Sequence, residues 1–282
     1  MSLKDNLINR SLRMRRMALT SIFEAKSGHP GGVLSAIDLV NFILCENLKK
    51  EKNSRFILSK GHAAPALYTA AAENGWIKPH ILSQLRKLGS PLQGHPSVVE
   101  TPWAETSTGS LGQGFSVAIG MSMGFRHQNN FSRVCVMLGD GELQEGEVWE
   151  GVMCAAHYKL NNLCAIIDYN KLQSDDLNEN IIALEPLGKK WESFNWNVIE
   201  IDGHDFDQIE AALTEAKKTT DKPSVVIANT IKGKGVSFME GVPAWHGSVK
   251  LLPEELEKAL LELEVSSEDI PSYIDGSIWS KL

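Results

Sequence analysis

Short apolar runs alternate along this chain with longer segments in which apolar residues recur at helical spacing. The runs at 134–138 and 163–167 are almost entirely apolar, which is typical of strands buried on both faces of a parallel sheet. Further strands are expected at 55–59, 197–202 and 224–230, and helices at 63–74, 79–88, 113–128, 145–158, 207–219 and 253–264. This alternation predicts an α/β fold with a three-layer, doubly wound, mostly parallel sheet.

The N-terminal region, residues 1–48, has a helical period that is interrupted at Ser27-Gly28-His29-Pro30-Gly31-Gly32. Because Pro30 has no N–H donor and is surrounded by glycines, we expect this interruption to be non-helical and the helix to resume at 35–48. We expect residues 1–265 to form a single domain. The residues after about Val265, 266–282, are expected to be a loose C-terminal tail.

Two of the expected strands end in side chains that carry oxygen. Gly139-Asp140-Gly141 follows the first apolar run, and Asp168-Tyr169-Asn170 follows the second. The carboxyl ends of parallel strands form the edge at which open α/β sheets bind ligands. One carboxylate and one amide oxygen suit Mg²⁺ with phosphate oxygens in its shell, and the glycines allow close approach of a diphosphate. Gly-Asp-Gly alone is also a common turn, so it is the pair of strand ends that indicates a metal–diphosphate site.

Histidines in expected loops are the second candidate for chemistry. A single loop histidine is more often structural, but four beside glycine or proline indicate a site. Imidazole passes protons near neutral pH and binds sugar hydroxyls and phosphate oxygens, so a polyhydroxylated, phosphorylated ligand fits. The four are His29, His62, His95 and His246, whereas His80, His127 and His157 fall in helical segments and His204 in a turn.

The glycine loop from Thr108 to Gly114 precedes an expected helix. Such a loop presents backbone N–H groups and a helix N-terminus to an anion, although many glycine loops are only tight turns. A dinucleotide fingerprint is the other reading, and it fails because no clear strand precedes the loop and no acidic strand end follows at the required spacing.

Composition narrows the class of protein. The 43% hydrophobic and 22% charged fractions are those of an ordinary globular protein, and the net charge of −7 argues against nucleic acid as a partner. No apolar run approaches the length that spans a bilayer, and charges near the start argue against a signal peptide, so neither membrane nor secretion is expected.

Scattered cysteines indicate reduced thiols in a cytoplasmic protein; they are Cys45, Cys135, Cys154 and Cys164. Four arginines are expected on the solvated face of the first helix: Arg10, Arg13, Arg15 and Arg16.

Taken together, the loop motifs resemble the N-terminal part of transketolase. They occur in the order found in that family: Ser-Gly-His-Pro-Gly, Ser-Lys-Gly-His-Ala, Gly-His-Pro, Thr-Gly-Ser-Leu-Gly-Gln-Gly, Gly-Asp-Gly-Glu-Leu-Gln-Glu-Gly and Trp-His-Gly. The resemblance covers roughly residues 10–250. It implies a thiamine diphosphate enzyme that transfers a two-carbon ketol unit from a ketose to an aldose.

The resemblance also implies residue roles. Asp140, Asn170 and the backbone carbonyl of Leu172 would hold Mg²⁺, with Ca²⁺ or Mn²⁺ as possible replacements. His29 and His246 would move protons on the reacting sugar hydroxyl. The full set implied for catalysis is His29, His62, His95 and His246, and that for cofactor contact is His62, Gly109, Ser110, Leu111, Gly139, Asp140, Gly141, Glu142, Asn170 and His246.

The chain ends before the pyrimidine-binding and C-terminal domains of the family. We therefore expect a second subunit that carries them, an α2β2 heterotetramer, and sugar phosphate substrates. Glu145 and Glu150 match acidic residues that link paired sites across the interface, or they are helix-start carboxylates. The alternatives are one subunit of another enzyme of this class, such as a 2-oxo acid dehydrogenase, and a non-catalytic thiamine diphosphate-binding subunit.

Overall fold

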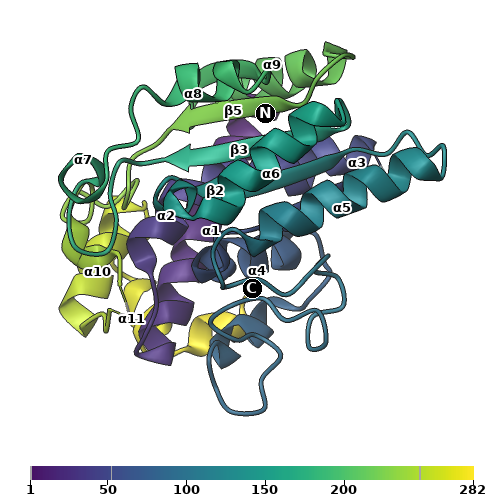
Figure 1. Cartoon of the computed structure of the whole chain (residues 1–282). Coiled ribbons are helices and arrows are strands. Elements are labelled where there is room, and N and C mark those ends of the chain that lie inside the picture. The colour runs from purple at the N-terminus through teal and green to yellow at the C-terminus, as the bar shows by residue number, and fades with distance from the viewer. Residues whose placement is uncertain (1, 52, 248) are drawn as a thin grey trace.

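The computed structural model describes residues 2–51, 53–247 and 249–282. Its centre is a five-stranded sheet with the strand order β1-β2-β3-β5-β4, in which all neighbouring strands are parallel (Figure 1). The strands are β1 (Arg55–Leu58), β2 (Val134–Gly139), β3 (Leu163–Tyr169), β4 (Asn197–Asp202) and β5 (Ser224–Asn229). The predicted fold class and all five predicted strands are confirmed.

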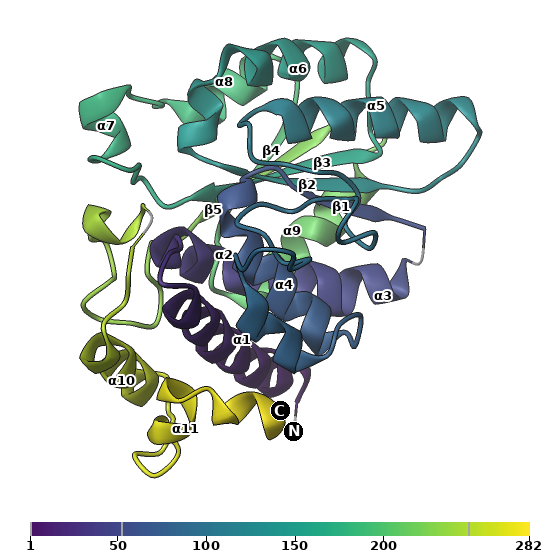
Figure 2. The same cartoon turned by 90° about the horizontal axis from the view of Figure 1, so that it is seen from below.

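Alternate residues of the central strands face two hydrophobic cores. Val136 and Ile167 belong to the core beneath α5, α6 and α8, whereas Met137 and Ile166 belong to the core beneath α1, α2, α4 and α9. Figure 2 shows these two helical layers on opposite sides of the sheet. The helices are α1 (Leu3–Ala25), α2 (Pro30–Phe42), α3 (Leu48–Lys50), α4 (Ala64–Glu73), α5 (Gln113–His127), α6 (Gly146–His157), α7 (Asn178–Ile181), α8 (Leu187–Ser193), α9 (Phe206–Lys218), α10 (Pro253–Glu262) and α11 (Ile270–Ile274).

The first interruption between helices is shorter than the sequence suggested. Helix α2 begins at Pro30, so the prediction of a non-helical segment is wrong for Pro30, Gly31 and Gly32. A proline is tolerated in the first helical turn because its missing N–H would have no partner there. Lys26 adopts a left-handed conformation with φ of 54° and ends α1, so only a few residues separate the two helices.

The stretch Pro30–Lys50 also corrects the prediction about membrane spans. It has 21 residues, and its most apolar 18-residue window has a mean hydropathy of 1.3, so the stretch is long and apolar enough for a span by length and composition. However, 89% of its most apolar window is buried inside the protein, as expected for a helix of the core.

Of the four α1 arginines, Arg13 is exposed as predicted, but the prediction of a solvated face is wrong for Arg10, Arg15 and Arg16, which are buried or half-buried. Arg15 is only 5% exposed and pairs with Asp38 on α2. Arg13 pairs with Glu73 on α4, and Arg10 pairs with Glu46. These side chains therefore attach α1 to its neighbours.

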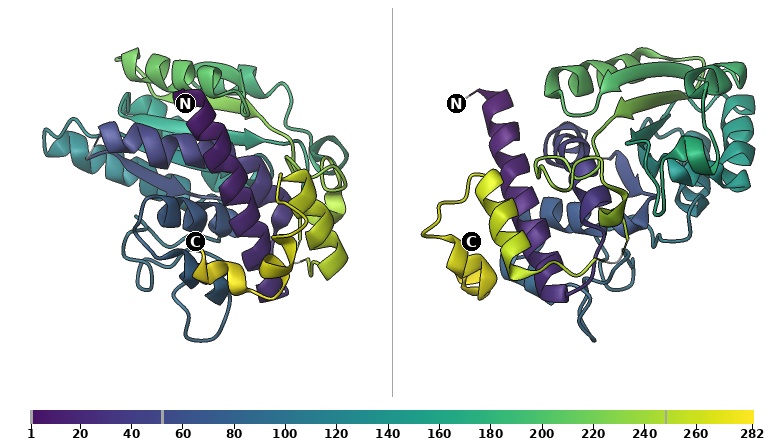
Figure 3. Two further views of the ribbon diagram at one scale, coloured as in Figure 1. Left: turned by 180° about the vertical axis from the view of Figure 1, so that it is seen from behind. Right: turned by 90° about the vertical axis from the view of Figure 1, so that its left-hand side faces the viewer.

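The C-terminal segment is not the loose tail that we predicted. Helix α11 and the 3₁₀ turn Ser277–Ser280 bring Tyr273 and Trp279 into the same core as α1, and each is 7% exposed. The indole of Trp279 donates to Glu24 on α1. Figure 3 shows α10 and this segment beside α1.

The remaining predicted helices differ from the structure in detail. Those at 63–74, 113–128, 145–158, 207–219 and 253–264 are confirmed within two residues at each end. The helix expected at 79–88 is instead a shorter 3₁₀ helix, Pro79–Gln84. Helices α7 and α8 were not predicted. The four cysteines are free thiols, as expected.

Candidate active site

A cavity of about 270 Å³ lies at the carboxyl ends of β1, β2 and β3. Loops from most of the chain contribute to its wall. The lining residues are His29, Gly32, Lys60, His62, His95, Gly109, Leu111, Gly139, Asp140, Gly141, Glu142, Asn170, Leu172, Gln173, Ser174, Lys232 and His246. The structure thus brings together all four predicted loop histidines and both predicted strand ends. Of the predicted site residues, Ser110 alone is not part of this lining.

Asp140 is a buried carboxylate at the end of β2. It is 2% exposed. Its Oδ1 accepts a hydrogen bond of 2.8 Å from the backbone N–H of Gly141, and its Oδ2 accepts one from the backbone N–H of Lys171. Burial, together with the neighbouring Asp168, raises the pKa of Asp140 to about 6. A cation placed against this carboxylate would remove much of that penalty.

Asp168 lies beneath the cavity rather than in its wall. It is fully buried in β3, where Lys60 Nζ lies 2.5 Å from Oδ2 and Ser35 donates at 2.7 Å. Burial opposes its ionisation, but Lys60 and the hydrogen bonds hold its pKa below the usual value. Asn170, just after the end of β3, therefore lines the cavity, whereas Asp168 forms an ion pair with Lys60 beneath it.

The two other predicted metal ligands follow β3. Asn170 Oδ1 accepts a hydrogen bond of 3.2 Å from the N–H of Leu172. The carbonyl of Leu172 accepts one of 2.6 Å from Lys232 Nζ. A carbonyl oxygen has two lone pairs, so this contact leaves one free for a further partner.

Three of the loop histidines form a cluster over the cavity. The ring centroids of His29 and His62 are 5.4 Å apart, those of His62 and His246 are 5.5 Å apart, and those of His29 and His246 are 6.1 Å apart. His95 lies at the rim, where its ring packs at Gly109. The loops thus place four imidazole rings around the same cavity.

These imidazoles are neutral near pH 7. Burial, with Arg86 next in importance, lowers the pKa of His29 to about 4, and burial with Lys232 lowers that of His246 to about 3. Burial and Lys60 lower the pKa of His62 well below its usual value. Neutral imidazole can accept a proton or a hydrogen bond, so the cluster is suited to binding hydroxyl groups.

Glu142 lines the cavity and also has a structural role, while its contact with the cofactor stays a prediction. It is 2% exposed, and its carboxylate accepts hydrogen bonds from the hydroxyl of Ser59, from Gly112 N–H at 2.9 Å and from Gly139 N–H at 3.0 Å. It therefore ties β1, the glycine loop and the end of β2 together.

Several predicted residues lie outside the cavity. Ser110 is exposed in the glycine loop, and Glu145 and Glu150 are exposed on α6. His127 and His157 are exposed near helix ends, as expected, and His204 is half-buried in a polar network instead of serving only a turn.

A family model described as the thiamine diphosphate-binding domain of transketolase matches residues 6–266. The chain belongs to the transketolase family. The 6-deoxy-6-sulfo-D-fructose transketolase subunit SqwG of Clostridium sp. (strain MSTE9) is 40% identical over 258 residues, which are 89% of this chain and 94% of that protein. An apulose-4-phosphate transketolase subunit of Phocaeicola vulgatus is 35% identical over 279 residues, or 96% and 99% of the two chains.

Solved transketolases share the fold. The enzyme from Leishmania mexicana superposes with a TM-score of 0.85 at 26% identity, and an R525L mutant from Pichia stipitis with 0.84 at 29%. Both matches cover 100% of this chain but only 46% and 45% of those chains. This chain thus spans less than half of the solved transketolases that it matches.

The cavity suits the anionic end of the cofactor of this family. Lys60 and Lys232, each 1% exposed, line it. Burial, with Lys60 next in importance, lowers the pKa of Lys232 to about 7, so a bound anion would favour its charged form. His29 Nδ1 and Gln173 Nε2 are buried and have no hydrogen-bond partner among the described residues. Unsatisfied buried nitrogens beside two buried lysines are groups that a phosphate-bearing ligand would complete.

The predicted metal set also fits, because it consists of one buried carboxylate, one amide oxygen and one carbonyl oxygen, all of which suit Mg²⁺. Among the described residues no group of three or more His, Cys, Asp or Glu could hold a metal ion, but the predicted set contains only one such residue. The assignment of Asp140, Asn170 and Leu172 to the metal stays a prediction.

Sequence reasoning missed the charged residues around the cavity. Lys60 stands within Ser-Lys-Gly-His, and Lys232 within Ile-Lys-Gly-Lys-Gly. A lysine in a glycine loop is a signal for a phosphate-binding site, and it was available for both.

Proposed function

We propose that this chain is the N-terminal subunit of a two-chain transketolase that uses thiamine diphosphate and Mg²⁺. It transfers a two-carbon ketol unit from a ketose or its phosphate to an aldose or its phosphate. The observation that carries this proposal is the convergence of three neutral imidazoles on the cavity that also contains Asp140, Asn170 and two lysines. A cofactor carrier without sugar chemistry has no need of those imidazoles.

The relatives support a partner subunit. Two proteins that this chain matches along nearly their whole length are named as subunits of transketolases. We propose that the partner carries the pyrimidine-binding and C-terminal domains, that the assembly is an α2β2 heterotetramer, and that it works in the cytoplasm. Glu145 and Glu150, exposed on α6, are then available to the interface.

The chain's own residues would hold the cofactor through its diphosphate. Asp140, the amide of Asn170 and the carbonyl of Leu172 would hold Mg²⁺, which Ca²⁺ or Mn²⁺ could replace. Backbone groups of the glycine loop and of Gly141 would approach the phosphates. When bound, thiamine diphosphate supplies the electron sink for breaking and forming a carbon–carbon bond.

The histidines would manage the substrate hydroxyl groups. His29 and His246 are neutral, so each can accept the proton of a sugar hydroxyl as a bond to its carbon breaks and return it as the new bond forms. An anion in the cavity would raise their pKa values toward the range in which such transfer is efficient. His95, at the rim, would bind the terminal hydroxyl of the donor, and His62 would lie near the diphosphate.

The test is a ketol-transfer assay of this chain with a pyrimidine-binding subunit encoded beside it. We expect activity only when both chains, Mg²⁺ and thiamine diphosphate are present. Asp140→Ala should abolish magnesium-dependent uptake of the cofactor. Transfer by this chain alone, or uptake unchanged by Asp140→Ala, would contradict the proposal.

The donor panel should include pentose phosphates, 6-deoxy-6-sulfo-D-fructose and apulose 4-phosphate, because two relatives are named for the last two compounds. His95→Ala separates transketolase from a non-catalytic subunit, since ketol transfer should fall sharply while a sensor would keep its function. Decarboxylation of a 2-oxo acid by the assembled chains would favour the dehydrogenase alternative instead.

A further inference from the structure

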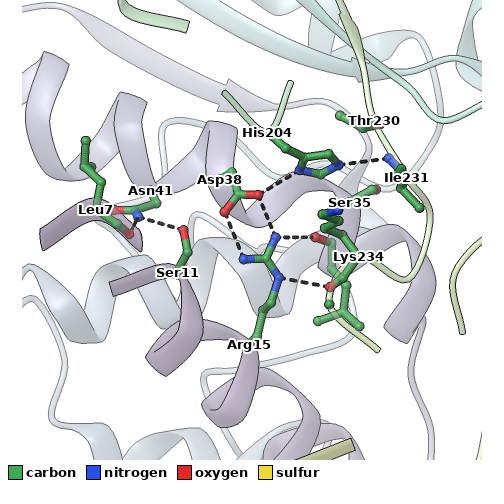
Figure 4. A network of polar contacts seen from close by, with 12 residues as sticks. Leu7, Ser11, Arg15, Ser35, Asp38, Asn41, His204, Thr230, Ile231 and Lys234 are labelled. Carbon is green, nitrogen blue, oxygen red and sulfur yellow. Dashed lines mark hydrogen bonds and ion pairs between the residues drawn. The ribbon is translucent and has the colours of Figure 1, made fainter. Parts of the chain in front are cut away.

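A buried polar network joins α1, α2 and the turn after β4 to the loop that follows β5. Its members are Arg15, Asp38 and His204, shown in Figure 4. Arg15 and Asp38 are each 5% exposed, and the side chain of His204 is 10% exposed. None of the three lines the cavity described above.

Arg15 and Asp38 form a two-pronged ion pair. Arg15 Nη1 lies 2.9 Å from Asp38 Oδ1, and Nη2 lies 2.7 Å from Oδ2. The third guanidinium nitrogen, Nε, donates to the backbone carbonyl of Lys234 at 3.0 Å. A planar guanidinium makes these three contacts through three separate nitrogens, a spread that a single ammonium nitrogen does not match.

His204 provides the second attachment to the same loop. The backbone N–H of Ile231 donates to His204 Nε2 at 2.9 Å. A backbone N–H is always a donor, so Nε2 carries no proton and Nδ1 donates to Asp38 Oδ2, at 2.7 Å. The contacts therefore fix the neutral tautomer of His204.

The two attachments lie on either side of Lys232. A third contact, from Gly233 N–H to the carbonyl of Gly31 at 3.0 Å, fixes the loop against α2. Lys232 is thereby directed into the cavity, where Nζ contacts the carbonyl of Leu172 and His246 Nδ1. These three contacts hold the backbone on both sides of Lys232 and so restrict the directions that its long side chain can take.

We propose that Arg15, Asp38 and His204 are positioning residues that fix Lys232 in the active-site cavity by holding the backbone of residues 231–234. The proposal rests on the proposed function only in treating the anion-binding cavity as the cofactor site. The network acts through Lys232 and does not itself touch the ligand.

Two substitutions of His204 test its bond to Asp38 and its bond to Ile231 separately. In His204→Asn the amide nitrogen can replace Nδ1 and keep the bond to Asp38, but nothing reaches Ile231. In His204→Gln the amide oxygen can replace Nε2 and accept from Ile231. Asn41→Ala is the matched control, because Asn41 is fully buried between α2 and α1, where it donates to the Leu7 carbonyl and Ser11 hydroxyl, yet makes no contact with this loop (Figure 4).

The first readout needs no cofactor. Lys232 and Lys60 are equally buried, so the ratio of their acylation rates, measured by mass spectrometry on the cofactor-free chain, reports selective release of Lys232. We expect His204→Asn to raise this ratio about tenfold, on the scale of one lost hydrogen bond. His204→Gln and Asn41→Ala should leave it unchanged. An unchanged ratio in His204→Asn, or an equal rise in Asn41→Ala, overturns the proposal.

The second readout is thiamine diphosphate affinity of the assembled complex. His204→Asn should weaken this affinity by about tenfold. In the Lys232→Met background it should weaken it no further, because His204 acts through Lys232. If His204→Asn weakens cofactor affinity equally in the wild-type and Lys232→Met complexes, the proposal is overturned. If the wild-type complex binds no cofactor, the proposed function fails, whereas the acylation ratio still decides the role of the network. Arg15→Lys has one nitrogen in place of three and should lose the contact with the Lys234 carbonyl, so it is the second variant for the acylation ratio if His204→Asn folds poorly.

Discussion

Replacing Gly61 by alanine adds one methyl group between two loops of the active site. Gly61 follows Lys60 and precedes His62. A Cβ built there would lie 2.8 Å from the backbone N of Gly109 and 2.9 Å from the carbonyl carbon of Thr108. Its backbone is not left-handed, so the cost of alanine comes from these contacts and not from its conformation.

The size of the effect follows from what the methyl group meets. Carbon atoms prefer separations of about 3.5–4.0 Å, so the overlap is about 0.6–1.2 Å, and it involves backbone that cannot rotate away. Overpacking of this kind costs about 1–3 kcal/mol of unfolding free energy. If the glycine loop moves by about 1 Å to relieve it, affinity or turnover can fall by about 10²-fold.

The assay measures both quantities on matched variants. Thermal unfolding of the chain gives the stability change, at roughly 2–4 °C per kcal/mol, and titration of the assembled complex gives cofactor affinity. Gly120→Ala is the control, because Gly120 is an exposed glycine inside α5 with no atom within 4 Å of the added methyl group. Alanine there should stabilise the chain by about 0.5–1 kcal/mol. Wild-type stability and cofactor affinity in Gly61→Ala would refute the reasoning.

Three further predictions concern single buried groups. Glu142→Gln should cost about 1–3 kcal/mol in thermal unfolding and weaken cofactor binding, because its new N–H₂ must face a backbone N–H of Gly112 or Gly139; full stability of this variant would contradict the role of Glu142. Trp279→Ala should cost about 3–5 kcal/mol, whereas a tail without a packing role would show no more change than Leu88→Ala, a substitution at a fully exposed site. Unfolding free energy should fall as pH drops from about 6.5 toward 4, since the unfolded chain binds a proton at His29 with a pKa near 6.5 while the folded chain binds it only near 4. Denaturant titrations across this range should show a smaller slope for His29→Gln, and an identical slope would show that His29 is protonated alike in both states.

The strands and the cavity could be predicted from the sequence because their signals are local. The run at 134–138 is apolar at every position, short and rich in β-branched residues, which is typical of a strand covered on both faces. The glycine-bounded loops with His29, His62 and His246 likewise carry their chemistry within a few residues. Their convergence then follows from parallel strands, whose carboxyl ends share one edge.

What could not be predicted depends on partners far away in the chain. Arg15 reads as a solvent-facing residue until Asp38 and the Lys234 carbonyl are placed beside it. The assignment of Asp168 also required Lys60, more than one hundred residues earlier, to be at its side. No local pattern encodes such pairs. Trp279 was missed for a related reason, because the short helical turns around it are too brief to show a period.

The alignment of β2 with β3 limits how this protein can change in length. Gly139 and Asp168 are directly opposed in the sheet. Inserting or deleting a single residue within either strand would turn the following side chains to the other face. In β3 such an event would place Asp168 in the apolar layer under α6 and leave Lys60 facing no anion. We therefore expect length variation among descendants of this chain to collect in surface loops away from the cavity, such as the exposed residues near Gln128, and to spare the strands that end at the cavity.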